Sequence, residues 1–379
     1  PFYAEGGGQL PDHGSIKAAN GEIEIDDVQT PIPGLIVHRG IVRQGEISQG
    51  ESVFAEIDRE RRTGISRAHT ATHMVHKAFR EILGETATQA GSENAPGRFR
   101  FDFPATGAVP KSVLQEVELR VNSLLEDDLE VTATEMTQVE ARKLGAMALF
   151  GEKYGDRVRV VSVGDWAKEL CGGTHVTRSG QLGVVKLLSE SSIGAGVRRV
   201  EALVGVDAFK FLAREHLILN SLTELIKGAQ PQELPERISN LLQAVKEMER
   251  EIRTYRQANG AKELESVKPK VIGKVQVITH KFSIELAGDD LRTLALNTRD
   301  KILNSVVILS SIQDSRVVLA VAVDEKSREL GIKAGELAKI ASSILGGGGG
   351  GKDDFAQGGG PNRDKLDIAF QEIIESLNR

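Results

Sequence analysis

The sequence has little of what secreted and membrane proteins depend on. Its 379 residues contain one cysteine, Cys171, so no disulfide can form within the chain. No apolar run reaches the roughly 18 residues that a membrane-spanning helix needs. The chain starts at Pro1 without an initiator methionine or a charged leader, so we expect no signal peptide and expect that a preceding segment has been removed. These absences predict a cytoplasmic protein that makes no contact with a membrane.

An excess of positive charge is also missing. The formal net charge is -6 and the isoelectric point is near 5.9, whereas a broadly basic nucleic-acid-binding domain commonly exceeds about 9. This charge argues against a generally basic, nonspecific binder of nucleic acid, but local basic faces remain possible. Each of the local clusters could equally be a solvated face or a set of ion-pair partners. The clusters are Arg59, Arg61, Arg62 and Arg67; Arg98 and Arg100; Arg198 and Arg199.

The first half of the chain predicts two units of an α/β (α+β) multidomain protein. Residues 1–60 alternate short apolar runs with Gly, Pro and Asp turns, which is typical of a small β-barrel-like unit. Residues 61–204 alternate helix and strand patterns and predict a core built on one mixed sheet. The expected helices cover 66–83 and 111–125, and the expected strands cover 99–103, 158–163, 183–189 and 197–204.

The second half predicts a helical arm and a glycine-rich α/β domain. Residues 205–268 have helical spacing that breaks near Pro231 and Pro235 and favours an intrachain hairpin over a coiled coil. Residues 269–379 alternate strand and helix patterns around the run Gly346 to Gly351. That run permits close backbone approach or a flexible loop. It does not predict a nucleotide-phosphate loop, because Lys352 is followed by Asp353 instead of Ser or Thr.

Two short motifs carry the chemistry. His69 and His73 lie one helical turn apart, where both imidazoles can reach one ion. Cys171 lies four residues before His175 on a turn softened by two glycines. Three neutral imidazoles and one thiolate make a tetrahedral set suited to Zn²⁺. The sequence therefore predicts that His69, His73, Cys171 and His175 bind zinc.

Several alternatives stay open at this point. His76 shares the helix and is expected to be a neighbouring polar contact instead of a spare ligand. Metalloprotease chemistry is disfavoured, because the position after the first histidine holds Thr70 where that motif needs a glutamate. A purely structural zinc fits as well as a catalytic one, since four protein ligands ordinarily close the coordination shell.

Six motifs in the expected order resemble the editing region and the C-terminal domain of alanyl-tRNA synthetase, and they span nearly the whole chain. They are Pro1 to Gln9, His69 to His73, Gln89 to Ser92, Arg100 to Phe103, Gly145 to Gly155, and Cys171 to His175, and the run Asp354 to Gly360 adds a further match in the C-terminal domain. One departure is Gly6, where the family often has serine. The resemblance implies hydrolysis of serine or glycine wrongly attached to tRNA(Ala), without the aminoacylating apparatus, and zinc held by the four residues above.

The resemblance also implies roles for further residues. Thr72 and Gln89 would line the pocket and recognise the misattached amino acid, although a helical threonine often bonds to its own backbone and a glutamine is often a surface residue. Arg100 and Asp102 are expected to form an ion pair that stiffens the pocket. The C-terminal region would grip mischarged tRNA(Ala) and, with the helical arm, form a homodimer. The rival readings are a free-standing editing deacylase and a noncatalytic tRNA-binding or dimerisation module with structural zinc.

Overall fold

The computed structural model describes residues 1–148 and 155–378. They divide into two compact units, Pro1–Leu225 and Ile226–Arg379. The boundary falls inside the expected helical arm, so the finer division into four domains stays a prediction. The part of the Gly145 to Gly155 motif from Leu149 to Tyr154 lies outside the described residues. In the part of the chain that the structure describes, no helix has the length and apolar character needed to cross a membrane.

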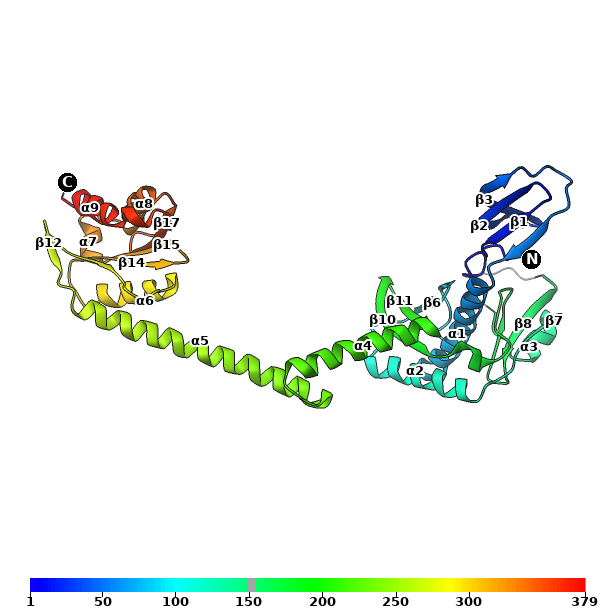
Figure 1. The fold of residues 1–379 in the computed structure, drawn as a ribbon. Helices are drawn as coiled ribbons and strands as arrows, with labels where there is room; N and C mark the ends of the chain where they lie inside the picture. The colour runs from blue at the N-terminus through cyan, green and yellow to red at the C-terminus, as the bar shows by residue number, and fades with distance from the viewer. Residues whose placement is uncertain (149–154, 379) are drawn as a thin grey trace. The chain divides into compact units, whose positions relative to one another are not determined.

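The N-terminal unit begins with a four-stranded antiparallel sheet in the order β3-β2-β1-β4 (Figure 1). Its strands are β1 (Gly14–Lys17), β2 (Gly21–Ile32), β3 (Leu35–Gly45) and β4 (Phe54–Ile57). Ile25 and Val28 of β2 pack with Phe2 in a small apolar cluster. The expected barrel-like unit is thus an open sheet whose edges are β3 and β4.

Helix α1 (Arg59–Leu83) carries the predicted histidines and begins earlier than the expected Ser66. The reason is local, because Asp58 caps the first turn by accepting a hydrogen bond of 2.9 Å from the Arg61 amide. The helix ends at Gly84, whose φ of 99° is strained for any residue with a side chain. The stretch before Ser66 is mostly polar, so the spacing of apolar residues did not indicate this first part of the helix.

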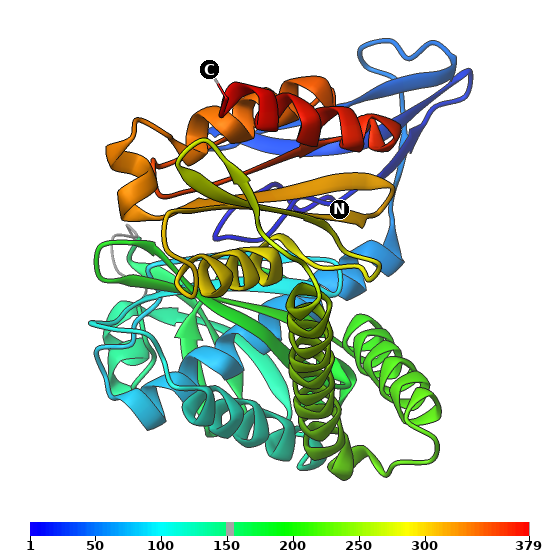
Figure 2. The same cartoon turned by 90° about the vertical axis from the view of Figure 1, so that its left-hand side faces the viewer.

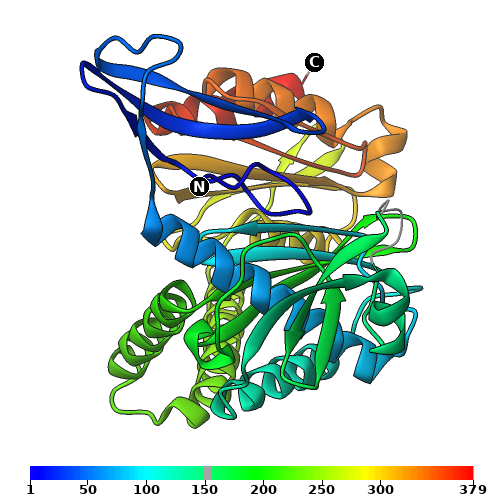
Figure 3. The same cartoon turned by 90° about the vertical axis from the view of Figure 1, so that its right-hand side faces the viewer.

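Two antiparallel sheets, not one mixed sheet, form the rest of this unit. One has the order β10-β11-β6-β5 and the other the order β7-β8-β9. Helix α1 packs along the first sheet and against α2, as Figure 3 shows. The sequence indicated the strands near 99–103, 158–163, 183–189 and 197–204 but not the other three, and strand pairing is a long-range choice that an apolar pattern does not encode. The remaining elements of this unit are β5 (Gly91–Ala95), β6 (Arg98–Pro104), α2 (Lys111–Glu126), β7 (Val131–Thr137), α3 (Gln138–Lys143), β8 (Arg157–Val163), β9 (Ala167–Leu170), the short 3-10 helix η1 (Ser179–Leu182), β10 (Val185–Gly194), β11 (Val197–Val204) and α4 (Val206–Leu225).

Strand β6 explains why one expected ion pair is wrong. Arg100 pairs with Glu93 on β5 at 2.6 Å, and Asp102 pairs with Arg199 on β11 at 2.7 Å. In each case the two partners lie directly opposite one another in neighbouring strands. Directly opposed residues are closer than residues two apart on one strand, so Arg100 and Asp102 pair across the sheet and not with each other.

The helical arm breaks where the two prolines predicted it. Helix α4 ends at Leu225, and α5 (Leu234–Glu265) follows the short 3-10 helix η2 (Pro231–Glu233), with Pro235 in its first turn. The expected seam of α5 is exposed, with Leu241 at 55% and Tyr255 at 70%. Because α4 and α5 belong to different compact units, the hairpin stays a prediction.

The C-terminal unit is a six-stranded sheet in the order β12-β13-β14-β15-β17-β16. Only β13 and β14 are parallel. Helix α6 covers one face, and α8 and α9 cover the other (Figures 1 and 2). Alternate residues of β14 therefore face opposite layers: Val306 and Ile308 face α8 and α9, while Val307 and Leu309 face α6. The elements are β12 (Lys270–Ile272), β13 (Val275–Lys281), α6 (Gly288–Arg299), β14 (Ser305–Gln313), β15 (Arg316–Val323), α7 (Glu325–Glu329), α8 (Ala334–Ile344), β16 (Gly349–Gly351), β17 (Phe355–Gly360), the 3-10 helix η3 (Arg363–Lys365) and α9 (Leu366–Ser376).

The glycine-rich run is structured and not a flexible loop. It supplies edge strand β16, which pairs with β17, and both strands lie close to α8. A Cβ on Gly349 would approach the carbonyl oxygen of Ala338 to 2.8 Å, and one on Gly360 would approach that of Leu345 to 2.2 Å. Gly350, the next residue after Gly349 on β16, has open space where its Cβ would lie. Glycine is thus required on the face of the hairpin that meets α8.

Candidate metal centre

The four predicted ligands meet at one point between α1 and the turn after β9. The possible ligand atoms of His69, His73, Cys171 and His175 all lie within 4.8 Å of one another. Nε2 of His69 and Nε2 of His175 each lie 3.3 Å from Sγ of Cys171. A tetrahedral zinc with ordinary bond lengths separates sulfur from nitrogen by about 3.6 Å. The arrangement therefore fits a metal ion bound by three imidazoles and one sulfur.

In His69 and His175 the ring nitrogen Nδ1 has a hydrogen-bond acceptor, which leaves the other ring nitrogen, Nε2, for a metal. Nδ1 of His69 lies 2.9 Å from Oε1 of Gln9, and Nδ1 of His175 lies 3.0 Å from Oγ1 of Thr70. Thr70 donates its only hydroxyl proton to the Ser66 carbonyl, so it accepts from His175. Metal-binding histidines characteristically donate their second N–H in this way. The donor set is thus already oriented toward a shared ion.

His73 and His76 share one carboxylate. Nδ1 of His73 bonds to Oε2 of Glu169, and Nδ1 of His76 lies 2.8 Å from Oε1 of the same residue. All three side chains are buried. The expectation that His76 is a neighbouring polar contact agrees with this geometry, since His76 is outside the four-residue group.

Burial and neighbouring charges shift the pKa values of His73, Cys171 and His175. Burial alone disfavours charge on His73, but Glu169 and Cys171 outweigh it and raise the pKa of His73 to about 10. Burial would raise the pKa of the Cys171 thiol, but His73 and His69 lower that pKa well below its usual value. Burial lowers the pKa of His175 to about 3, so its imidazole is neutral. The cluster therefore favours a thiolate at Cys171, which is the form that binds metal.

Gln9 ties the N-terminal segment to the metal centre. Its Oε1 accepts from the Thr174 amide at 2.8 Å, and its Nε2 donates to Oγ1 of Thr174 at 2.9 Å. Gly173 lies so close that a Cβ there would meet the His69 ring at 2.1 Å. The glycine between Cys171 and His175 is therefore needed for the approach of α1, and the N-terminal segment helps to hold the turn.

The two predicted recognition residues each contact a side chain of β5, Thr72 that of Asn94 and Gln89 that of Ser92. Thr72 is buried on α1, with its hydroxyl 3.0 Å from the Ala68 carbonyl and 2.6 Å from Oδ1 of Asn94. Gln89 is half-buried between α1 and β5 and donates to Oγ of Ser92 at 3.1 Å. Nδ2 of Asn94 is buried without a hydrogen-bond partner among the described residues. Asn94 is a polar contact of Thr72 that the sequence did not point to, and the roles of Thr72 and Gln89 stay predictions.

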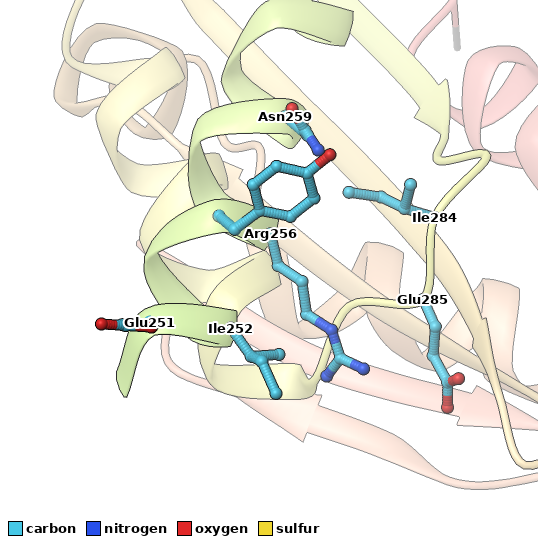
Figure 4. A pocket seen from close by; sticks show the side chains of 7 residues that line it. Glu251, Ile252, Arg256, Asn259, Ile284 and Glu285 are labelled. Atoms are coloured by element: carbon cyan, nitrogen blue, oxygen red, sulfur yellow. The ribbon is translucent and has the colours of Figure 1, made fainter. Parts of the chain in front are cut away.

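A second surface of interest lies within the C-terminal unit. An open groove of about 540 Å³ runs between α5 and the segment that joins β13 to α6. Figure 4 shows the Arg256 side chain reaching from α5 toward the segment with Ile284 and Glu285. Exposed Tyr255 also lines this groove. Its mixture of apolar, basic and acidic side chains does not single out one kind of partner.

Comparisons with known proteins match the whole chain to one family. The chain is 55% identical to the alanine–tRNA ligase of Acidothermus cellulolyticus over 100% of its own length and 43% of that enzyme. Over its whole length the chain is thus similar to alanyl-tRNA synthetase. The corresponding enzyme of a Nocardioides species is 54% identical over 100% of the chain and 43% of the relative. The chain therefore matches a C-terminal portion of alanyl-tRNA synthetase and spans less than half the length of these relatives.

Three family models match separate parts of the chain. They are the class II (A) tRNA synthetases at residues 1–61, the second additional domain of threonyl and alanyl tRNA synthetases at residues 158–201, and the DHHA1 domain at residues 274–379. The crystal structure of the C-Ala domain from Aquifex aeolicus alanyl-tRNA synthetase is 28% identical, with a TM-score of 0.28, and covers 30% of this chain and 99% of its own. The second of the three models includes Cys171 and His175, so half of the candidate metal centre lies in a segment shared with threonyl and alanyl tRNA synthetases.

Proposed function

We propose that this portion of alanyl-tRNA synthetase is an editing hydrolase that removes serine or glycine wrongly attached to tRNA(Ala). The observation that carries the proposal is the convergence of His69, His73, Cys171 and His175 on one point, next to Thr72 on the same helix. The relatives are alanine–tRNA ligases, whose synthetic pocket for a methyl side chain cannot strongly exclude glycine or a side chain with one added hydroxyl. A second, hydrolytic site would supply the missing discrimination.

The ion that fits the four ligands best is zinc. Zn²⁺ is commonly held by imidazole and thiolate in a tetrahedral set, and the thiolate would leave one net positive charge at the centre. When bound, zinc would supply a fixed positive charge near the aminoacyl ester. The chain's own residues hold that charge in place: Gln9 and Thr70 fix His69 and His175 by hydrogen bonds to their Nδ1 nitrogens.

Thr72 is suited to recognise serine through its remaining hydrogen-bonding capacity. A hydroxyl has one proton and two lone pairs, and the proton of Thr72 can go to Ala68 or to Asn94 but not to both. If the Asn94 amide is turned so that its nitrogen donates to Thr72, both contacts are satisfied and one lone pair of Thr72 remains. That lone pair can accept the hydroxyl proton of a serine substrate.

The proposed activity predicts a strong preference between two substrates. Incubated with Ser-tRNA(Ala) or Ala-tRNA(Ala), the zinc-loaded chain should release serine much faster than alanine. The measurement is the loss of acid-precipitable labelled amino acid with time at limiting enzyme. Equal inertness toward both substrates, in a protein shown to contain zinc, would contradict the catalytic proposal and leave a noncatalytic tRNA-binding module.

Replacing Thr72 with valine should separate the two misattached amino acids. Valine keeps the shape and removes the hydroxyl, so hydrolysis of Ser-tRNA(Ala) should fall roughly 10-fold, the equivalent of one hydrogen bond of about 1.4 kcal/mol. Gly-tRNA(Ala), which has no side-chain hydroxyl, is the matched control and should be hydrolysed at nearly the parent rate. An equal fall for both substrates would mean that Thr72 supports the fold through Ala68 and Asn94 instead of reading the substrate.

We also propose that the C-terminal unit binds the tRNA and that the exposed stripe of α5 pairs with a second copy of the chain. The open face of the glycine hairpin, at Gly348 and Gly350, lets a phosphate backbone approach closely, and exposed Lys352 adds attraction that weakens with salt. The stripe of α5 includes Leu241, which is 55% exposed. Exposed apolar side chains at this spacing are typical of a helix that binds another helix.

A further inference from the structure

Glu169 is a charged residue in an apolar interior, and both of its oxygens are engaged. The residue is 3% exposed and belongs to β9. One oxygen bonds to Nδ1 of His73, and the other lies 2.8 Å from Nδ1 of His76. The two histidines lie on the same side of α1, close to one turn apart. A single carboxylate thus connects β9 to two successive imidazoles of α1.

These contacts fix which nitrogen of each ring carries a proton. A carboxylate can only accept, so each Nδ1 must donate, and Nε2 of a neutral His73 is left with its lone pair. Nε2 of His73 is buried without a hydrogen-bond partner among the described residues, and it is the ligand atom that His73 can offer to the group. Once a metal ion replaces the proton on Nε2, the carboxylate therefore holds His73 in the tautomer that presents this nitrogen as a ligand.

We propose that Glu169 is a positioning residue of the metal centre, held between His73 and His76 so that Nε2 of His73 points at the other three ligands. The inference rests on the proposed metal site and adds two residues to it. His76 is the second donor: it occupies the carboxylate oxygen that His73 leaves over. Without it, the buried Glu169 would keep one oxygen unpaired in the core and would be free to turn away from His73.

The apolar surroundings of Glu169 and His76 strengthen the hydrogen bonds that hold the His73 ring. The His76 imidazole packs against the Phe101 ring, with centroids 5.3 Å apart, and Phe101 is fully buried. Hydrogen bonds in such a dry, apolar environment are stronger than in water, and leaving one unmade costs more. Loss of the carboxylate should therefore be felt at the ion even though Glu169 does not touch it.

The first test replaces Glu169 with glutamine in the full 379-residue chain. Glutamine keeps the size but offers one acceptor and one donor, so it cannot accept from both imidazoles. Zinc affinity, measured by competition with a chromophoric chelator, should fall 10- to 100-fold, as is usual for the loss of an outer hydrogen-bonding partner. The visible absorption bands of the cobalt-substituted protein should change in intensity, because the His73 ring is no longer fixed. Glu135→Gln, which removes an exposed carboxylate from β7 of the same sheet, should leave affinity and spectrum unchanged.

A second pair of variants tests the role of His76 and does not depend on the folding of the first. His76→Asn places an amide N–H near the position of Nδ1, whereas His76→Leu has a similar size and no donor. The asparagine variant should keep zinc affinity within about 3-fold of the parent, and the leucine variant should lose more than the asparagine variant does. Equal affinities for both, at equal thermal stability of the metal-free proteins, would overturn the part assigned to His76.

The outcomes distinguish this inference from the proposed function. If the parent chain binds no zinc, the proposed metal site fails. If the parent binds zinc and Glu169→Gln binds it equally tightly with an unchanged cobalt spectrum, only the positioning role of Glu169 fails. If Glu169→Gln does not fold, the comparison of His76→Asn with His76→Leu decides the matter.

Discussion

Replacing Cys171 with serine should abolish zinc binding and, with it, the release of serine from Ser-tRNA(Ala). The serine hydroxyl stays neutral near neutral pH, so the site would keep its three imidazoles and lose its only anionic ligand. The loss of affinity should exceed the roughly 100-fold upper range for outer-shell partners, because Cys171 would touch the ion directly. Metal content after gel filtration and the initial rate of deacylation measure the two effects.

The control for this variant is a histidine outside the group. His216 lies on the exposed surface of α4 and exchanges a hydrogen bond with Asn220, so His216→Asn should retain both zinc and activity, whereas His175→Asn should behave like Cys171→Ser. Thermal unfolding separates two roles of the ion. A variant that loses activity at unchanged stability indicates zinc in the reaction, and a variant that loses stability first indicates zinc as a structural tie between α1 and the turn. Full zinc content and activity in Cys171→Ser would refute the ligand assignment.

Replacing Gly360 with alanine should destabilise the C-terminal unit by about 1 to 3 kcal/mol, the usual effect of forcing a methyl group into a filled interior. The added Cβ would lie 2.2 Å from the Leu345 carbonyl oxygen, and a backbone atom cannot move aside as the end of a side chain can. For a unit of this size, the midpoint of thermal unfolding should fall by roughly 3 to 10 °C. Differential scanning calorimetry of the whole chain would show this in the transition of the C-terminal unit.

Gly350 is the matched control on the partner strand of the same hairpin. A methyl group there meets nothing within 4 Å, so Gly350→Ala should leave the midpoint of thermal unfolding unchanged or slightly higher. The slight rise would arise because alanine has fewer conformations than glycine in the unfolded chain. The same variant also tests the proposed RNA face, since a methyl group on the open side should weaken tRNA binding only if the RNA backbone comes close. A fall in stability for Gly350→Ala equal to that for Gly360→Ala would contradict the assignment of one face to α8.

The sequence predicted the parts of this protein that depend on local spacing. The histidine pair requires only that residues 69–73 be helical, and a cysteine and a histidine flanking two glycines suffice to suggest a second half of a metal site. Three strands of the C-terminal sheet were indicated by the apolar runs at residues 275–278, 305–309 and 317–323, and the run 305–309 is apolar throughout most of its length because it is buried on both faces. Helix α1 began earlier than expected, since its first turns are polar and are set by the cap at Asp58.

Features that depend on contacts between distant segments were missed. The expected pair of Arg100 and Asp102 was wrong because each residue faces a different neighbouring strand, and the sequence does not say which strands are neighbours. For the same reason the sequence predicted a single mixed sheet, whereas the structure has two antiparallel sheets. The glycine run did not resemble a strand, because glycine has no side chain to pack, and its purpose appears only once α8 lies against it.

The outer residues of the metal centre left a weak signal in the sequence. Glu169 lies two residues before Cys171, and the twofold alternation of an extended segment places both on one side. A strand at Ala167–Leu170 was not expected, so this signal went unused. Gln9 had no signal of its own, because it reaches His69 from 60 residues away.

The separation of the ligands along the chain has a consequence for synthesis on the ribosome. Cys171 lies 102 residues after His69, so α1 is complete long before its partners exist. At the usual elongation rate of about 5 to 20 residues per second, the interval is roughly 5 to 20 seconds. During that time the nascent helix presents three imidazoles and an apolar face with no cysteine to complete the coordination. Assembly of the four-residue group is therefore a late event in translation, and any factor that shields the emerging segment would have to release it after His175 leaves the exit tunnel.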